Sequence, residues 1–167
     1  MAPAALWHTG RVPYWIDGNN VAAISSADKE RGREKRRALL EHLSILRGSR
    51  GGRFVVYFDG DDADRRIPPS GVQVRYAAPR SADAAIVDHL RAAAKPREVT
   101  VVTNDHELAN RCRHAGARTM RWGEFAERSQ RPVTTTRPTK GGAAEEPPVK
   151  LADWKGYLGL TDSDLEG

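Results

Sequence analysis

Short apolar segments that alternate with helical patterns restrict the fold of this sequence more than any other feature. Each segment has the length of a strand, and a strand that is apolar on both sides is buried on both faces. Such strands are typical of a parallel sheet covered by helices, so we expect an α/β fold in which helices cover both faces of a mostly parallel sheet. The predicted strands are 12–17 (VPYWID), 53–58 (RFVVYF), 72–77 (VQVRYA), 98–103 (EVTVVT) and 118–122 (RTMRW). The predicted helices are 34–47, 82–94 capped by Ser81, 105–115, and a short one that begins at GEFAER.

The regular pattern stops near residue 128, which divides the chain into three parts. Residues 1–128 are predicted to form one compact domain. Residues 129–150 are rich in proline, threonine and glycine, and we expect them to be a linker. Residues 151–167 regain apolar side chains such as Trp154 among four carboxylates. This tail motif is expected either to dock on a protein partner or its own domain, or to be a disordered end.

Composition excludes several classes of protein. No apolar run is long enough to cross a bilayer, and the first ten residues do not resemble a secretory signal. Cys112 is the only cysteine, so an internal disulfide is impossible and a cytoplasmic location is the default expectation. Cys112 lies in a helical pattern and is expected to be a small buried side chain rather than a nucleophile.

Basic residues gather in one part of the sequence. The net charge is +5, and residues 29–53 hold nine basic but three acidic side chains. A basic region on a folded domain favours a polyanion, and nucleic acid first. The alternative is a solvated helix face with no ligand. The candidate ligand-binding residues in this region are Lys35, Arg36, Arg37, Arg50 and Arg53.

Carboxylates follow the predicted strands at their ends. Asp17 ends the first strand, Asp59 follows the second, and Asp105 follows the fourth, while Asp83 lies in the first turn of a predicted helix. Ligands bind at the carboxyl ends of the strands in an open parallel sheet, so these four side chains are expected to share one edge. Carboxylates held together repel one another unless a cation is present. Oxygen ligands suit Mg²⁺ or Mn²⁺, and these ions are the expected cofactors.

Each of these acids also has a plain structural interpretation. Asp17 could form a turn with Gly18, although Asn20, three residues on, is placed to orient it or a bound water. Asp83 could simply complement a helix dipole. Asn104 and Glu107 have the spacing of a capping box, which predicts that Asn104 caps the next helix and leaves Asp105 free at its first position.

Four motifs together resemble the YacP-like NYN domain of the PIN-like ribonuclease superfamily. They are WIDGNNVA, VVYFDG, SADAAIVDHL and VTVVTNDHELANRCRHAGARTM, and the resemblance covers residues 12–128. It implies a Rossmann-like fold with an acidic pocket that binds Mg²⁺ or Mn²⁺ and hydrolyses RNA. Asp17, Asn20, Asp83 and Asp105 match the family's site positions, and Asp59 matches the acidic end of the second strand. The sequence departs from the family at Ala84, where relatives often carry a second acid, and at Glu107, where some relatives carry an aspartate.

The resulting expectation is a metal-dependent endoribonuclease. Asp17, Asp83 and Asp105, helped by Asp59, would hold the metal, and Asn20, Thr103 and Asn104 would orient the ligands. The basic region would hold RNA backbone, and a ribosomal context is one option for that RNA. The competing interpretation is a non-catalytic RNA- or ribosome-binding module of the same fold. A phosphatase that uses FDGDD as a nucleophile loop fits poorly, because the first strand ends in DGNN.

Overall fold

The computed structural model describes residues 13–24, 28–50, 53–61, 68–69 and 71–130. The predicted linker beyond residue 130, the tail motif and the side chain of Arg50 lie outside this description. Within the described residues, no helix is both long and apolar enough to cross a membrane.

Five strands form a single parallel sheet in the order β3-β2-β1-β4-β5, which confirms the predicted α/β fold. All five predicted strand segments contain a strand. The strands are β1 (Pro13–Asp17), β2 (Arg53–Phe58), β3 (Val72–Tyr76), β4 (Thr100–Val102) and β5 (Arg118–Met120). The helices are α1 (Gly18–Val21), α2 (Lys29–Arg50), α3 (Ala82–Ala92), the 3-10 helix η1 (Pro96–Glu98), α4 (His106–His114) and α5 (Trp122–Gln130).

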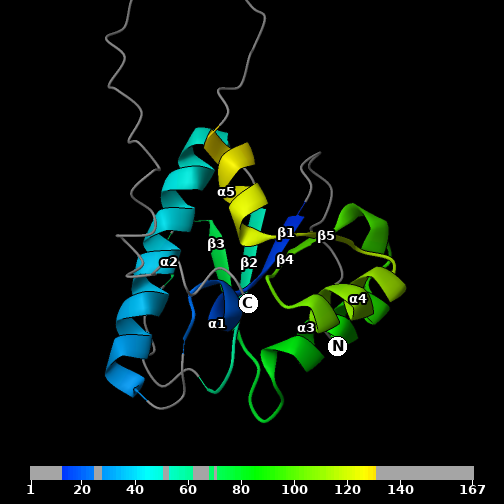
Figure 1. Cartoon of the computed structure of the whole chain (residues 1–167), viewed down its shortest axis with the longest axis horizontal. Helices are drawn as coiled ribbons and strands as arrows, with labels where there is room; N and C mark the ends of the chain where they lie inside the picture. The colour runs from blue at the N-terminus through cyan, green and yellow to red at the C-terminus, as the bar shows by residue number, and fades with distance from the viewer. Residues whose placement is uncertain (1–12, 25–27, 51–52, 62–67, 70, 131–167) are drawn as a thin grey trace, which may run out of the picture.

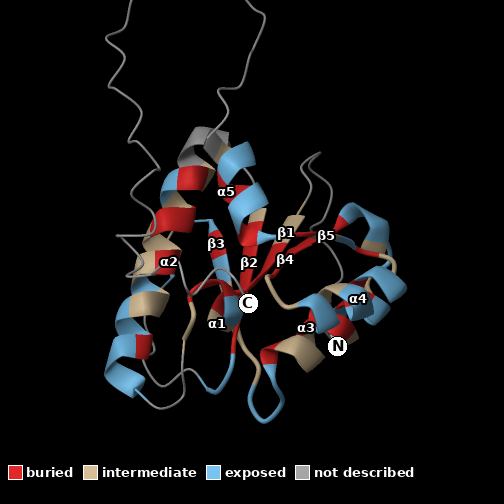
Figure 2. Cartoon of the chain, in the orientation of Figure 1, coloured by how far each residue is buried: buried red, intermediate tan, exposed pale blue. Residues whose placement is uncertain are grey.

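Helices cover both faces of the sheet, and each face has its own apolar core. Side chains alternate along a strand, so neighbouring residues in β1 and β2 point to opposite faces. Ile16 packs with Leu43 of α2 and Phe125 of α5 on one face. Trp15 packs with Ile86 of α3 and Leu108 of α4 on the other. Figure 1 shows the sheet between these two helical layers, and Figure 2 shows that burial is concentrated on the strands and on the inner helix faces.

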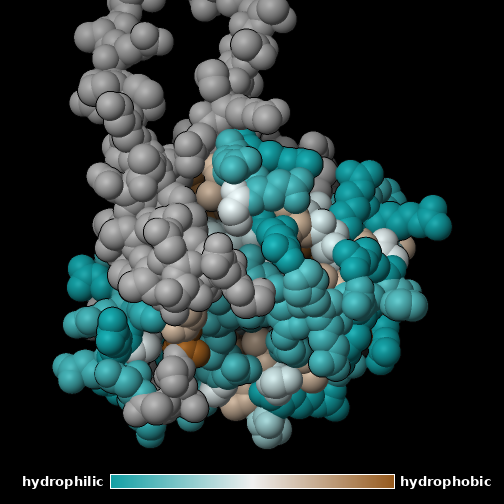
Figure 3. All heavy atoms as spheres, in the orientation of Figure 1, coloured by the Kyte–Doolittle hydropathy of each residue, from teal (hydrophilic) through white to brown (hydrophobic). Residues whose placement is uncertain are grey.

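The outer surface of the helices is polar. Hydrophilic side chains cover most of the described surface on the face drawn in Figure 3. Ile45 of α2, at 58% exposure, is the one exposed large hydrophobic side chain among the described residues. Cys112 is buried in the α3–α4 core, as predicted, and burial raises the pKa of its thiol to about 12. A thiol with so high a pKa is a poor nucleophile at neutral pH.

Several element boundaries differ from the sequence prediction. Helix α2 begins five residues earlier and ends three residues later than the predicted 34–47. Its leucines define only the buried part, and its charged ends continue the helix without an apolar signal. The sequence predicts a strand that ends at Trp122, but this residue begins α5 instead. The short helix α1 was not predicted at all, because four residues carry no helical periodicity.

Candidate active site

An acidic pocket of about 420 Å³ lies at the carboxyl edge of the sheet. The sheet order places β1 at the centre, between β2 and β4, so the loops after these three strands meet there. The described residues that line the pocket are Asp17, Asn19, Asn20, Ala23, Ile24, Asp59, Asp83 and Asp105. All four carboxylates expected at this edge are therefore brought together, and no lysine, arginine or histidine is among these described lining residues.

Asp17 is the most buried of the four acids. It is the last residue of β1 and only 2% exposed. Its Oδ2 accepts a hydrogen bond from the Thr103 hydroxyl at 3.0 Å, and its Oδ1 accepts one from the Asn20 backbone N–H at 3.4 Å. Burial raises the pKa of Asp17 to about 7, with a further increase from the charge of Asp83, while the two hydrogen bonds lower it. A carboxylate in this position gains stability when a cation binds beside it.

Asp59 connects three elements at the rim of the pocket. Its Oδ1 accepts a hydrogen bond from the Ala82 N–H of α3 at 2.6 Å. Its Oδ2 accepts one from Nδ2 of Asn19 at 3.1 Å, and the Asp59 N–H returns a bond to Asn19 Oδ1 at 3.2 Å. Both carboxylate oxygens are thus engaged within the protein. Asp59 holds the end of β2 against α1 and α3, a role that the sequence did not reveal.

Asp83 lies in the first turn of α3 and is partly buried. Ser81 caps this helix as predicted, with its Oγ accepting from the Ala84 N–H at 3.2 Å. The carboxylate of Asp83 has no hydrogen-bond donor among the described residues, so its two oxygens are available to a ligand. Burial and the charges of Asp105 and Asp59 raise its pKa, and Arg111 opposes them.

Asp105 is the N-cap of α4, and the predicted capping arrangement was wrong. Its backbone is extended (φ −74°, ψ 116°), and Oδ1 accepts from the N–H groups of Glu107 at 2.7 Å and Leu108 at 3.1 Å. Asn104 instead accepts a hydrogen bond from the Trp122 N–H at the start of α5, at 3.1 Å. Asp105 uses one oxygen for both capping bonds, so its Oδ2 has no hydrogen-bond partner among the described residues.

Asn20 fixes the loop after β1 to the loop after β4. Its side-chain Oδ1 accepts from the Asn104 N–H at 2.8 Å and lies 3.4 Å from the Thr103 hydroxyl. Because Thr103 has one hydroxyl proton and lies closer to Asp17, it donates mainly to that carboxylate. Asn20, Thr103 and Asn104 therefore form one network around Asp17. Asn19 was missed by the sequence analysis, although the doubled asparagine of DGNN was the available signal.

The candidate RNA-binding residues of α2 do not share one surface. Lys35 Nζ donates to the Ala23 carbonyl at 2.8 Å, which holds the loop that lines the pocket. The Arg36 guanidinium lies over the Phe58 ring, 5.5 Å from its centroid. Arg37 forms an ion pair with Glu41 at 2.8 Å. Arg53 is the first residue of β2, at the opposite edge of the sheet from the pocket.

The pocket chemistry fits a hard divalent cation. Within the described residues, no group of three histidine, cysteine or acidic side chains is close enough to share one ion. Mg²⁺ needs fewer, because it commonly uses one or two carboxylates and keeps several waters. Burial raises the pKa values of Asp17 and Asp83, and the charges of the neighbouring carboxylates raise them further. The residues present therefore suit a hydrated Mg²⁺ or Mn²⁺ ion.

The chain is thus a parallel α/β sandwich with an acidic pocket at its carboxyl edge. The family model of the YacP-like NYN domain matches residues 14–146, and the chain belongs to this family, a branch of the PIN-like nucleases. A search of curated proteins gave no significant match.

Two solved structures of Rae1 (YacP) from Bacillus subtilis share the fold. One is of a tryptophan-to-leucine mutant; it is 21% identical, with a TM-score of 0.54, and the match covers 71% of this chain and 74% of that one. The other is 19% identical, with a TM-score of 0.57, and the match covers 70% and 72% of the two chains.

Proposed function

We propose that this protein is a metal-dependent endoribonuclease that hydrolyses RNA phosphodiester bonds. The observation that carries the proposal is the convergence of four carboxylates on one pocket, with the central one, Asp17, buried and raised in pKa. Such an arrangement is unfavourable in a purely structural site and is expected where a cation binds. Membership of a nuclease family supports RNA hydrolysis as the reaction class.

Asp17, Asp83 and Asp105 would surround the Mg²⁺ or Mn²⁺ ion, with one or two of them bound to it directly and the rest through its waters. When bound, the ion would lower the pKa of a water molecule and stabilise negative charge on the phosphate. Asp83 and the Oδ2 of Asp105 are suited to this role because neither has a hydrogen-bond donor among the described residues. Thr103 and the Asn20 N–H hold the carboxylate of Asp17 in one orientation, as a metal ligand requires. Asp59 acts on the geometry of the rim, through Asn19 and Ala82.

A second candidate is an RNA- or ribosome-binding module without catalysis. The observation that favours it is the structural use of two of the acids, Asp59 between elements and Asp105 as a helix cap. In this case the fold would bind RNA, and the acidic pocket would be a former active site that no longer catalyses cleavage.

Cleavage of a circular single-stranded RNA separates these candidates, because only an endonuclease can open a circle. The parent should cleave it with Mg²⁺ or Mn²⁺ and not with EDTA. Asp83→Asn should slow cleavage by about a hundredfold or more, the scale on which losing one electrostatic stabiliser of a transition state acts. Glu98→Gln is the matched control, since Glu98 is an exposed carboxylate in η1, just before β4 and away from the pocket. Binding of the RNA without cleavage in the presence of either metal would favour the second candidate.

A further inference from the structure

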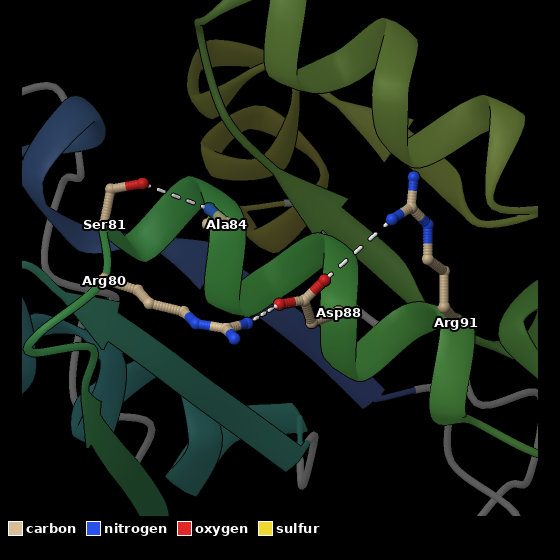
Figure 4. A network of polar contacts seen from close by, with 5 residues as sticks. All are labelled: Arg80, Ser81, Ala84, Asp88 and Arg91. Atoms are coloured by element: carbon tan, nitrogen blue, oxygen red, sulfur yellow. Dashed lines mark hydrogen bonds and ion pairs between the residues drawn. The ribbon is translucent and has the colours of Figure 1, made fainter.

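Two arginines share a single carboxylate on the outer side of α3. Arg80 Nη1 contacts Asp88 Oδ2, and Arg91 Nη1 lies 3.9 Å from Asp88 Oδ1 (Figure 4). The arginine side chains are 67% and 71% exposed, and the Asp88 side chain is 41% exposed. Two positive charges against one negative charge leave this surface with a net positive charge in contact with solvent.

A third guanidinium lies near α3. Arg75 is on the edge strand β3, on the sheet face where α3 packs mainly against β1 and β2. Its Nε is buried and has no hydrogen-bond partner among the described residues. Its charge acts on His89 of α3, and burial and this charge both lower the pKa of that histidine. His89 therefore adds little positive charge of its own beside Arg75 at pH 7.

The arginine surface begins near the acidic pocket at Arg80 and runs along α3 to Arg91 in its last turn. Arg80 directly precedes Ser81 and Ala82, and the Ala82 N–H donates to Asp59 at the pocket rim. Asp83, which lines the pocket, follows in the same turn. In α2, Arg37 pairs with Glu41 and Lys35 donates to the Ala23 carbonyl.

We infer that Arg75, Arg80 and Arg91 form a surface that binds the phosphodiester backbone of RNA next to the pocket. The inference rests on the proposed nuclease function. A guanidinium presents paired N–H donors that match the oxygens of a phosphate. Asp88 lies between the two exposed guanidinium groups, and its contact with Arg80 leaves less side-chain freedom to be lost when a phosphate binds. The surface supplies the attraction for a polyanion that an acidic pocket lacks.

Binding of a fluorescent single-stranded RNA, measured by anisotropy in EDTA at several salt concentrations, tests this surface without cleavage. The Arg80→Gln/Arg91→Gln double variant should bind more weakly. The slope of log K against log[salt] should fall by about 0.7 for each lost phosphate contact. Asp88→Asn should bind RNA more tightly, because it removes the competing negative charge. A folding defect cannot produce that gain.

Arg128→Gln is the charge-matched control. Arg128 is an exposed arginine of α5, on the opposite helical layer, and has its own partner in Glu124. It should leave affinity and slope unchanged. If the double variant fails to fold, Arg91→Gln alone serves, since Arg91 is in the last turn of α3 and mostly exposed.

Two results would overturn the inference. One is parent-like binding by the arginine variants, and the other is an equal loss from Arg128→Gln, which would indicate a general charge effect. Failure of the proposed function would be seen separately, as an absence of cleavage by a parent protein whose binding still depends on these arginines.

Discussion

The protonation of Asp17 is set by where the chain places it. A strand-ending aspartate at the centre of a parallel sheet is buried by its neighbours on both sides, and here only the Thr103 hydroxyl and one backbone N–H compensate. Its pKa therefore rises from 3.8 to about 7. Without metal, the folded protein holds a proton on Asp17 that the unfolded chain releases at lower pH.

Asp17 should make the metal-free protein less stable as the pH rises. The folded protein binds the Asp17 proton more tightly than the unfolded chain does. This contributes fully to the free energy of unfolding below about pH 4, and the contribution is lost as the pH rises from 4 to about 7. The loss is at most about 1.4 kcal/mol for each pH unit. Urea unfolding of the parent and of Asp17→Asn in EDTA, from pH 4.5 to 7.5, gives the difference between them. With rising pH, the free energy of unfolding of the parent should fall relative to that of the variant. A difference that does not change with pH would show that Asp17 ionises normally in the folded protein.

Gly18 is required by space rather than by backbone conformation. A Cβ at this position would lie 2.7 Å from Cδ1 of Phe58 and 2.8 Å from Cγ1 of Val56, both in the core. Gly18→Ala should therefore destabilise the protein by about 1–3 kcal/mol, the usual cost of overpacking. Gly123 in α5 is the control, because a Cβ there meets nothing within 4 Å. Gly123→Ala should stabilise the helix by up to about 1 kcal/mol. Equal effects in chemical denaturation would contradict this account.

At the scale of elements, the ends of helices carry the site. Asp17 caps α1, Asp105 caps α4, and Asn104 receives the first N–H of α5. Capping and ligand binding thus fall on the same side chains. This dual use explains why a local sequence pattern assigned the cap of α4 incorrectly. Asn104 and Asp105 are both good N-caps, and the partner that decides between them, Trp122, is 18 residues away.

Asp105 offers a clean separation of its two roles. Asparagine caps helices as well as aspartate does, so Asp105→Asn should keep the stability of the parent while losing RNA cleavage. Asp105→Ala should lose cleavage as well, and also about 0.5–2 kcal/mol of stability, because the Glu107 and Leu108 N–H groups lose their acceptor. Thermal unfolding and a cleavage assay on both variants check this. A stable Asp105→Ala protein would show that water replaces the cap without cost.

The strands were easier to predict than the contacts of the charged side chains. Residues 53–58 form β2 as expected. A strand that is buried on both faces has an almost continuous apolar sequence, and this pattern is easy to recognise. The basic stretch 29–53 was predicted to bind RNA backbone, and this stays a prediction. A helix turns successive side chains by about 100°, so neighbouring residues in this stretch have different surroundings. Lys35 contacts a loop carbonyl, Arg36 lies over an aromatic ring, and Arg37 pairs with a carboxylate. Counting charge along the sequence could not show these separate partners.

For the whole molecule, the sheet order brings distant acids together. Asp17, Asp59, Asp83 and Asp105 come from four segments, and the rule that ligands lie at the carboxyl ends of parallel strands was enough to expect their meeting. The hydrogen bonds among them were not predictable, because they depend on loop conformations such as that of Asn19 and Asn20. The fold therefore tolerates a concentration of negative charge that metal binding should relieve.

Asp83→Asn should leave the metal-free protein as stable as the parent or more stable. The substitution removes one repelling charge and breaks no hydrogen bond among the described residues. Mn²⁺ should raise the melting temperature of the parent. At a hundredfold excess over Kd, an ion that binds only the folded state stabilises it by about 2.7 kcal/mol. The variant should lose most of this shift. Calorimetry with EDTA and with Mn²⁺ measures both. A variant that is much less stable in EDTA and still responds fully to Mn²⁺ would place the metal elsewhere.

The central position of β1 also affects how rarely this strand opens to solvent. Hydrogen bonds from β2 and β4 hold β1 on both sides, whereas β3 and β5 are each paired on one side only. Amide protons of β1 should exchange with solvent only when the whole domain unfolds, and those of the edge strands should exchange through smaller openings. Hydrogen-exchange mass spectrometry would rank the strands in this order. Asp17 would then stay in place through fluctuations that briefly release Arg75 on β3, so the pocket persists while the neighbouring arginine surface adjusts to its ligand.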